Sequence, residues 1–134
     1  MSSIQASVEF EVPFHDCDPM QIVWHGRYFQ YFELARTELF RARQLDIPAV
    51  RDLGLRMYVA DVRCRFTSPL TYGDRVEVVA TAKEASPLIR IAYSVRNLTK
   101  KRRSARGYCV LATTDAQGDL LTETPEIIRE RLLG

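Results

Sequence analysis

The chain opens with apolar and polar residues that alternate over positions 7–14, which predicts a half-buried β-strand. Pro13 indicates that this strand lies at the edge of a sheet or ends there, because proline has no backbone N–H to donate to a neighbouring strand. The apolar face of the predicted strand consists of Val8, Phe10, Val12 and Phe14.

From Gly26 onwards the apolar residues recur at helical spacing, and we expect one long helix over residues 26–44. A stripe this rich in aromatic residues is expected to pack against a sheet. The sequence Asp-Ile-Pro at 46–48 ends the helix, and a short connector over 51–54 follows. The stripe contains Tyr28, Phe32, Ala35, Leu39 and Ala42.

Four further segments, rich in β-branched and aromatic residues and separated by turns, predict strands. Thr124 as N-cap and Pro125 at the first position indicate a closing helix over 126–132. The strands span 58–66, 76–83, 88–98 and 104–114, and in the first of them Tyr58, Ala60, Val62, Cys64 and Phe66 share one face.

This order of elements predicts one α+β domain over residues 1–134. Strands joined by short turns favour antiparallel pairing, and one amphipathic helix covers one face of such a sheet. We therefore expect a curved antiparallel sheet wrapped around the long central helix. Part of the sheet would remain uncovered, which predicts a homodimer or homotetramer joined through sheet edges or faces.

Composition narrows the class of protein. With 46% hydrophobic residues, 27% charged residues and a net charge of +2, the chain gives no overall argument for binding nucleic acid or membranes. Three cysteines without CxxC spacing, no leader-like segment and no apolar run of about 20 residues make the cytoplasm the expected location. The two histidines, His15 and His25, lack paired-ligand spacing, so we expect no metal.

Ionisable residues gather in the loop His15–Gly26, between the first strand and the long helix. The run DCDPMQIVWHGRYFQYFELAR, at 16–36, resembles the loop and helix signature of the 4-hydroxybenzoyl-CoA thioesterase branch of the hotdog-fold superfamily. A second run, FTSPLTYGDRVEV at 66–78, is similar to a strand–turn–strand segment of the same families. The resemblance spans essentially the whole chain. It implies a hotdog-fold enzyme that hydrolyses acyl- or aroyl-thioesters, with coenzyme A as part of the substrate and no separate cofactor.

The resemblance also implies roles for residues of this loop. Asp18 corresponds to the catalytic carboxylate of the family, and the backbone N–H of His25 corresponds to the donor that polarises the thioester carbonyl. The family often has a small residue and a glycine after the Asp-Pro pair, where this chain has Met20 and Gln21, and this departure bears on the width of the acyl pocket. The residues expected to border the substrate are Met20, Gln21, Trp24 and Tyr28.

The chemistry of these residues supports the same roles. Thioester hydrolysis needs a nucleophile or a base that activates water, and a donor for the oxyanion. Asp18 suits either role, although an aspartate before proline is also a common turn former. The ring of His25 either orients substrate or is satisfied by the backbone, and Asp16 is expected to bind backbone N–H groups. Cys17 lies between two acids, which disfavours a thiolate nucleophile.

Four consecutive cations lie between two predicted strands and therefore at the tip of a hairpin. They suit the phosphates of coenzyme A or the surface of an acidic acyl-carrier protein, and they equally suit a solvated tip that protects a sheet edge. No aromatic residues alternate with them, so nucleic-acid binding is not expected. These cations are Lys100, Lys101, Arg102 and Arg103.

Two other functions remain open at this point. A hotdog-fold dehydratase acting on 3-hydroxyacyl thioesters would use a histidine and an acid such as His25 and Glu33. A non-catalytic acyl-thioester binding protein would share the fold without turnover. The aromatic residues near the loop suit either a pocket for an aryl acyl group or the protein core, and Met20 suits a flexible acyl chain. A medium-length or aromatic acyl group is therefore expected.

Overall fold

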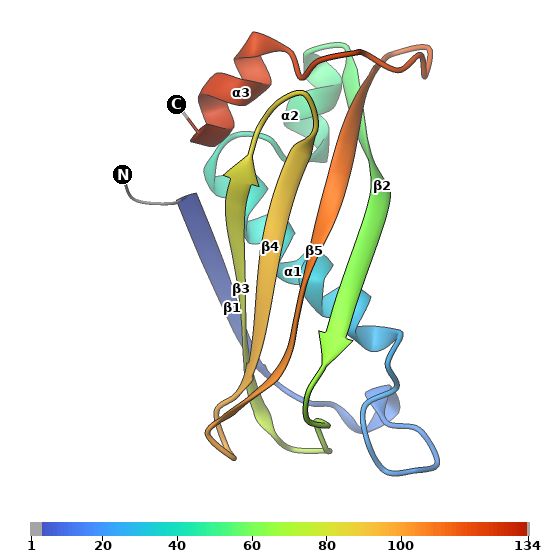
Figure 1. The fold of residues 1–134 in the computed structure, drawn as a ribbon, viewed down its shortest axis with the longest axis vertical. Helices are drawn as coiled ribbons and strands as arrows, with labels where there is room; N and C mark the ends of the chain where they lie inside the picture. Colours follow the sequence, from blue (N-terminus) through green and yellow to red (C-terminus); the bar gives the residue numbers. More distant parts are fainter. Residues whose placement is uncertain (1–3, 134) are drawn as a thin grey trace.

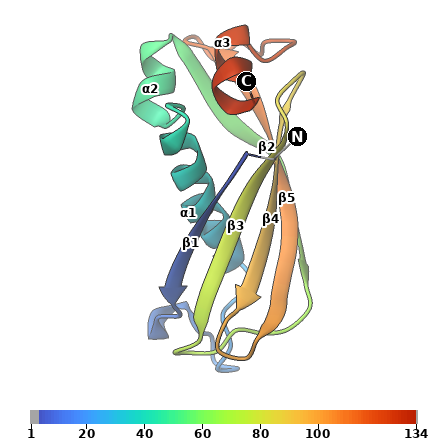
Figure 2. The same ribbon diagram turned by 90° about the vertical axis from the view of Figure 1, so that its left-hand side faces the viewer.

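The computed structural model describes residues 4–133 and consists of a five-stranded antiparallel sheet that curves around one long helix (Figure 1). The strand order is β1-β3-β4-β5-β2, and seen from the side the helices lie together on one face of the sheet (Figure 2). This arrangement confirms the predicted α+β architecture. The elements are β1 (Ile4–Glu11), a 3₁₀ turn (Phe14–Asp16), α1 (Arg27–Ala42), α2 (Ile47–Asp52), β2 (Leu55–Phe66), β3 (Arg75–Glu84), β4 (Ile89–Asn97), β5 (Arg102–Asp115) and α3 (Glu126–Leu133).

The two edges of the sheet are formed by β1 and β2. Strand β1 ends at Glu11, so Pro13 does follow the end of an edge strand, as predicted. Phe14 was expected in the apolar face of this strand, and that expectation was wrong. It lies in the 3₁₀ turn with 76% of its surface exposed, because the chain leaves the sheet after Val12.

Helix α1 buries its aromatic stripe against the sheet. The ring of Phe32 stacks on that of Tyr93 from β4, with centroids 4.3 Å apart and an interplanar angle of 4°. The observed helix is shorter than the prediction by one residue at its start and two at its end. The segment after it is not a simple connector as predicted but contains α2, which accommodates Pro48 because proline is tolerated in the first turn of a helix.

Strand β2 contains an irregularity that the sequence pattern did not reveal. Val59 pairs with Leu111 and Asp61 pairs with Val110, so Ala60 is an extra residue in the ladder. An extra residue moves the side chains that follow it to the opposite face. The prediction that one alternating set runs from Tyr58 to Phe66 was therefore wrong. The set facing the helix is Leu55, Met57 and Val59 before the irregularity, then Val62, Cys64 and Phe66 after it.

We expect Gly107→Ala to destabilise the protein, because Gly107 is where α1 approaches the sheet most tightly. A Cβ atom there would lie 3.0 Å from two ring carbons of Phe32 and would collide with the carbonyl oxygen of Arg63. Overpacking of this kind typically costs about 1–3 kcal/mol. Urea unfolding measures the loss, and Tyr108→Ala, on the outward face beside it, is the comparison. Equal stability of wild type and Gly107→Ala would contradict the tight approach.

Candidate active site

The acidic residues predicted to carry the chemistry lie on a tight loop that precedes α1. The Asp18 N–H donates to the carbonyl of Ile22 over 2.9 Å, and the Gln21 N–H donates back to the carbonyl of Asp18 over 2.8 Å. Gln21 has φ 67°, a left-handed conformation that favours glycine. The loop therefore has the left-handed backbone conformation that a glycine would favour, although the residue at this position is a glutamine.

One oxygen of the Asp18 carboxylate is held and the other is free. Oδ1 accepts the Met20 N–H over 2.8 Å, and Oδ2 has no partner among residues 4–133. The side chain is half-buried. The turn role of Asp18 and a reactive role are thus compatible, because the turn fixes the carboxylate while leaving one oxygen for substrate or water.

The start of α1 presents an unbonded donor. Arg27 and Tyr28 donate their N–H groups to the carbonyls of Trp24 and His25, whereas the His25 N–H has no acceptor within the described part of the chain. It lies at the positive end of the helix dipole, which stabilises negative charge. The His25 ring is exposed and packs against aromatic neighbours, with centroids 5.2 Å from Trp24 and 6.4 Å from Phe66.

Asp16 holds the loop against the first turns of α1. Its buried carboxylate accepts a 2.7 Å hydrogen bond from the Tyr31 hydroxyl, and its other oxygen lies 3.4 Å from Arg27 Nε and 3.5 Å from His15 Nε2. The Trp24 N–H donates to the Asp16 carbonyl over 3.0 Å. Burial and the hydrogen bond to Asp16 raise the pKa of Tyr31, so this hydroxyl remains a donor.

This network was missed in the sequence, where Asp16 was assigned only to backbone N–H groups. The signal was present in the helical spacing. Arg27 and Tyr31 are four residues apart and therefore share one face of α1, where both can reach an acid in the preceding loop. The carboxylate binds these two side chains, while the backbone bond to Trp24 is made by the Asp16 carbonyl.

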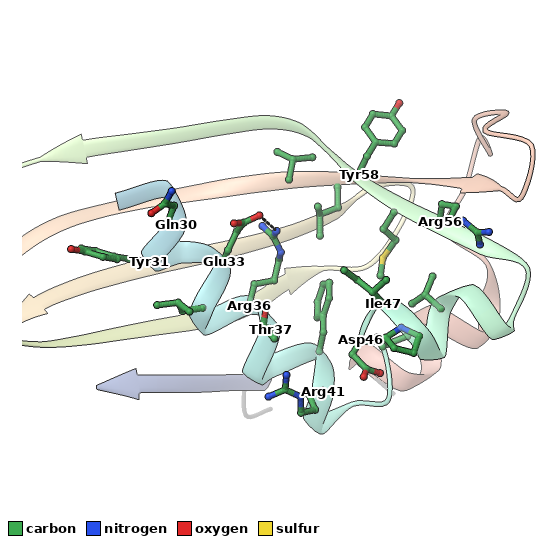
Figure 3. Close-up of a pocket in the computed structure, with 18 of the residues that line it drawn as sticks. Gln30, Tyr31, Glu33, Arg36, Thr37, Arg41, Asp46, Ile47, Arg56 and Tyr58 are labelled. Carbon is green, nitrogen blue, oxygen red and sulfur yellow. Dashed lines mark ion pairs between the residues drawn. The ribbon is translucent and has the colours of Figure 1, made fainter. Parts of the chain in front are cut away.

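A groove of roughly 1080 Å³ runs along α1, bounded by β2 and α2 (Figure 3). The figure shows Gln30 and Tyr31 at one end, Arg36 and Thr37 midway, and Ile47 near the other end. The first end is polar and is lined by His15, Asp16, Arg27, Gln30 and Tyr31. The far end is mostly apolar, with Phe40, Ile47, Leu55, Met57 and Val59.

The residues predicted to border the substrate are not all in one place. Met20 is 77% exposed, Gln21 is exposed and Trp24 is 50% exposed, so these three are accessible on the loop. Tyr28 instead lies in the core, where its hydroxyl is 3.0 Å from Ser104 Oγ. None of the four lines the groove.

The predicted basic hairpin joins β4 to β5 and lies at the same end of the molecule as the loop before α1 (Figure 1). The prediction that all four cations lie at the tip was wrong for Arg102 and Arg103, because β5 begins at Arg102 and both residues pair with β4. The four cations also differ in their contacts. The Lys100 ammonium is 3.3 Å from Asp74 Oδ2 and 3.0 Å from Thr71 Oγ1. Lys101, Arg102 and Arg103 are exposed and have no carboxylate within 4.0 Å in the part of the chain that is described.

Asp74 connects this hairpin to the loop between β2 and β3. Its Oδ2 accepts hydrogen bonds from the backbone and hydroxyl of Thr71 at 2.9 and 3.1 Å and from Asn97 Nδ2 at 2.8 Å. Burial would raise the pKa of Asp74, but the hydrogen bonds from Thr71, Asn97 and Lys100 outweigh it and lower this pKa. The buried charge is therefore a stabilising one.

The cysteines are poorly suited to act as nucleophiles. All three are free, and burial together with the charges of Asp16 and Asp18 raises the pKa of the Cys17 thiol. This direction agrees with the expectation from the sequence. Within residues 4–133 no three side chains of the metal-binding types come together, and no helix there is long and apolar enough to cross a bilayer.

Comparison with solved structures defines the class of fold. The protein has the hotdog fold. It aligns with AQ1494, a protein of Aquifex aeolicus described as hypothetical, at a TM-score of 0.84 and 28% identity. The alignment covers 94% of this chain and 98% of the other. The 1,4-dihydroxy-2-naphthoyl-CoA thioesterase Slr0204 of Synechocystis aligns at a TM-score of 0.84 and 17% identity, with 96% and 95% covered. The predicted hotdog fold is confirmed.

The chain belongs to the thioesterase-like superfamily, whose family model matches residues 12–132. An Aquifex aeolicus protein named "Putative esterase" is 37% identical over 75 residues, which cover 56% of this chain and 59% of that protein. The Bacillus subtilis protein named "Putative acyl-CoA thioesterase YneP" is 30% identical over 70 residues, 52% of this chain and 51% of that protein. The matched segments thus span little more than half of each of these relatives.

We expect Asp16 and Tyr31 to be energetically coupled. Asp16→Asn and Tyr31→Phe each weaken a buried hydrogen bond to a charged group, which typically costs about 1–3 kcal/mol of unfolding free energy. Because both variants affect the same contact, their costs should fall short of additive by more than about 0.5 kcal/mol. A double-mutant cycle by urea unfolding measures this. Tyr28→Phe is the control partner, since its hydroxyl bonds Ser104. Equal coupling in both cycles would contradict the assignment.

We expect Asp74→Asn to destabilise the protein at neutral pH and much less in acid. The folded-state pKa of Asp74 is lowered, so its stabilisation is complete above the unfolded pKa of about 3.9 and disappears as pH falls through the folded value. The difference in unfolding free energy, about 1–3 kcal/mol at pH 7, should therefore shrink below about pH 3. Urea unfolding at both pH values tests this, with the exposed turn variant Asp119→Asn as control. A difference that does not change with pH would contradict it.

Proposed function

We propose that the protein hydrolyses acyl- or aroyl-thioesters of coenzyme A, with Asp18 as nucleophile or general base. The observation that carries this proposal is the half-buried Asp18 carboxylate with one free oxygen, on a loop that leads to an unbonded N–H at the start of α1. Membership of the thioesterase-like superfamily supports the reaction class. The free cysteines support a reducing, cytoplasmic setting.

In the nucleophilic route, Asp18 Oδ2 attacks the thioester carbonyl carbon and the C–S bond breaks. The coenzyme A thiolate leaves, and water then hydrolyses the mixed anhydride to release the acid and restore Asp18. In the general-base route, Asp18 takes a proton from the water that attacks, the C–S bond breaks, and the proton passes to the departing thiolate. Both routes place negative charge on the carbonyl oxygen, to which the His25 N–H would donate a hydrogen bond. One such donor is typically worth about 3–4 kcal/mol of barrier.

Asp18 suits the reactive role better than Asp16 does. The Asp16 carboxylate already faces a tyrosine hydroxyl, a guanidinium and an imidazole, so both of its oxygens are engaged by other side chains. Asp18 has one backbone donor only among the described residues, so its second oxygen is available. Asp16 is better described as the residue that positions the loop.

The groove along α1 is the proposed site of the acyl group. It starts at a polar end formed by Arg27 and Tyr31, close in sequence to the His25 N–H, and becomes apolar towards Ile47. Arg27 and Arg41 are fourteen residue steps apart along the helix, which corresponds to about 21 Å. A groove of that length suits a medium or long acyl chain, and its polar end also suits an aryl group that carries hydroxyls.

The proposed assembly is a homodimer joined through β2. This strand is a sheet edge of 12 residues whose side chains are largely exposed on both faces, including Tyr58 at 48%, Val62 at 37% and Phe66 at 46%. A long open edge of this kind pairs readily with another strand. Pairing of two such edges would leave the outward face of each sheet exposed and would bring the groove of one protomer next to the other protomer.

The structure favours hydrolysis over the dehydratase alternative. Glu33 lies eight residues after His25, about 12 Å further along the helix. Its carboxylate faces Arg36 at 3.6 Å, and the His25 ring faces Trp24 and Phe66. A histidine and an acid that act together on one substrate carbon need to be close to the same point, and these two are directed elsewhere.

We expect Asp18→Asn to lower kcat for thioester hydrolysis by at least about a thousandfold with little change in stability, because it removes the nucleophile or base and retains the turn oxygen. Release of free thiol from a panel of acyl- and aroyl-CoA esters measures kcat and KM.

Asp16→Asn is the matched control, since it removes a carboxylate from the same loop. It should lose stability while keeping much more of the turnover. Turnover by Asp18→Asn comparable to wild type, or a larger loss of turnover in Asp16→Asn, would remove Asp18 from the reactive role.

A further inference from the structure

The outward face of the sheet carries a cluster of arginines that the reaction does not use. This arginine face consists of Arg63, Arg65, Arg96, Arg103 and Arg106. These side chains share one face because their strand neighbours, such as Cys64 and Val95, point to the helix side. Arg65 pairs directly with Arg106, and Arg96 pairs directly with Arg103, so the cluster crosses β2, β5 and β4.

This arrangement is unfavourable for the isolated sheet. Like charges placed directly opposite each other on neighbouring strands are destabilising. Among the described residues only Arg63 has a carboxylate within 4.0 Å, that of Asp61 at 3.6 Å, while the other four have none. Arg96 also lies opposite Glu77 of β3, whereas the next cross-strand neighbour of the Arg65–Arg106 pair is Ser94. An opposed arginine pair without an acidic neighbour, such as Arg65 and Arg106, is expected where an anionic partner supplies the missing charge.

The arginine face adjoins the candidate active site from the other side of the sheet. Arg65 precedes Phe66, whose ring centroid is 6.4 Å from that of His25. Arg103 precedes Ser104, whose Oγ is 3.0 Å from the Tyr28 hydroxyl. The face therefore ends at the same group of loops that holds Asp18, as the shared end of β2, β4 and β5 in Figure 1 shows. The hairpin tip with Lys101 extends the positive charge there.

Its shape suits a protein surface more than a free nucleotide. Neither the groove along α1 nor the smaller hollow beside Tyr72 is lined by any of these arginines, whereas small ligands occupy concave sites. Arginines about 5 Å apart across strands match carboxylates on successive turns of an acidic helix. Stacking of nucleic-acid bases is not favoured, because the nearby Tyr108 ring is covered by the Arg90 guanidinium at 4.0 Å.

We propose that the arginine face docks an acidic acyl-carrier protein, which delivers its thioester on a phosphopantetheine arm around the end of the sheet to Asp18. This rests on the proposed thioesterase activity for its chemistry, but the docking itself is a binding event that does not need turnover. Charge complementarity makes such docking fast and dependent on salt.

The variant Arg65→Glu tests the docking. It places an acid opposite Arg106, so it should fold and melt at a higher temperature than wild type. Binding is measured by calorimetry at low salt with a carrier protein whose acyl group is attached by a hydrolysis-resistant amide. The dissociation constant should rise at least about tenfold. Arg51→Glu, with the same charge change on α2, should bind like wild type.

Turnover provides the second readout. KM for an acyl-carrier protein should rise at least about tenfold in Arg65→Glu, while kcat/KM for the same acyl group on coenzyme A should stay within about twofold. An equal loss on both substrates would make the face a nucleotide site and overturn the proposal. Three other results would also overturn the proposal. The variant could bind the carrier with wild-type affinity, or the wild-type protein could bind a single-stranded RNA more tightly than the carrier. The third result is a larger assembly of this chain that the variant dissociates.

Failure of the docking and failure of the proposed activity give different results. A wild-type protein that hydrolyses acyl-CoA but does not bind the carrier would contradict the docking alone. A protein that binds the carrier through the arginine face but hydrolyses neither thioester would contradict the activity alone.

Discussion

The packing of α1 into the concave face of the sheet is the constraint on which the rest of the structure depends. Phe32 stacks on Tyr93, and Gly107 has no side chain to keep the helix away. Burial of this aromatic stripe supplies the main driving force for the position of the helix. Once the axis of α1 is fixed, its first turn must emerge beside the ends of the strands, and the unbonded N–H of His25 is presented there rather than in the core.

Polar contacts then fix the positions of the loops, which the apolar core does not determine. Two buried acids hold the loops at this end of the molecule: Asp16 binds the loop before α1 to the helix, and Asp74 binds the β2–β3 loop to the β4–β5 hairpin. Hydrophobic burial is not directional, whereas a hydrogen-bonded carboxylate specifies particular partners. The position of Asp18 is set by these directional contacts, since its own bonds are confined to its turn.

The two faces of the sheet are chemically distinct. The inner face is apolar and binds the helix, while the outer face carries opposed arginines where β4, β5 and β2 approach the loops. The side-chain period of a strand is two, so one strand such as β5 contributes to both faces at once, with Cys109 inside and Arg106 outside. A site on one face and a charged surface on the other can therefore share the same few strands.

The sequence by itself determined the order and type of the five strands, the long helix and the closing helix, because the two-residue and helical periods of apolar residues persist along these segments. It did not reveal α2, which is too short to show such a period. It also located the loop with Asp18 and the start of the long helix just after His25, since local motifs carry that information. The tertiary structure decided which side chains meet. Three features depend on contacts between separate elements or on strand register: the hydrogen bond between Asp16 and Tyr31, the ion pair of Lys100 with Asp74, and the irregularity at Ala60. Such contacts and register shifts leave no periodic pattern in the sequence.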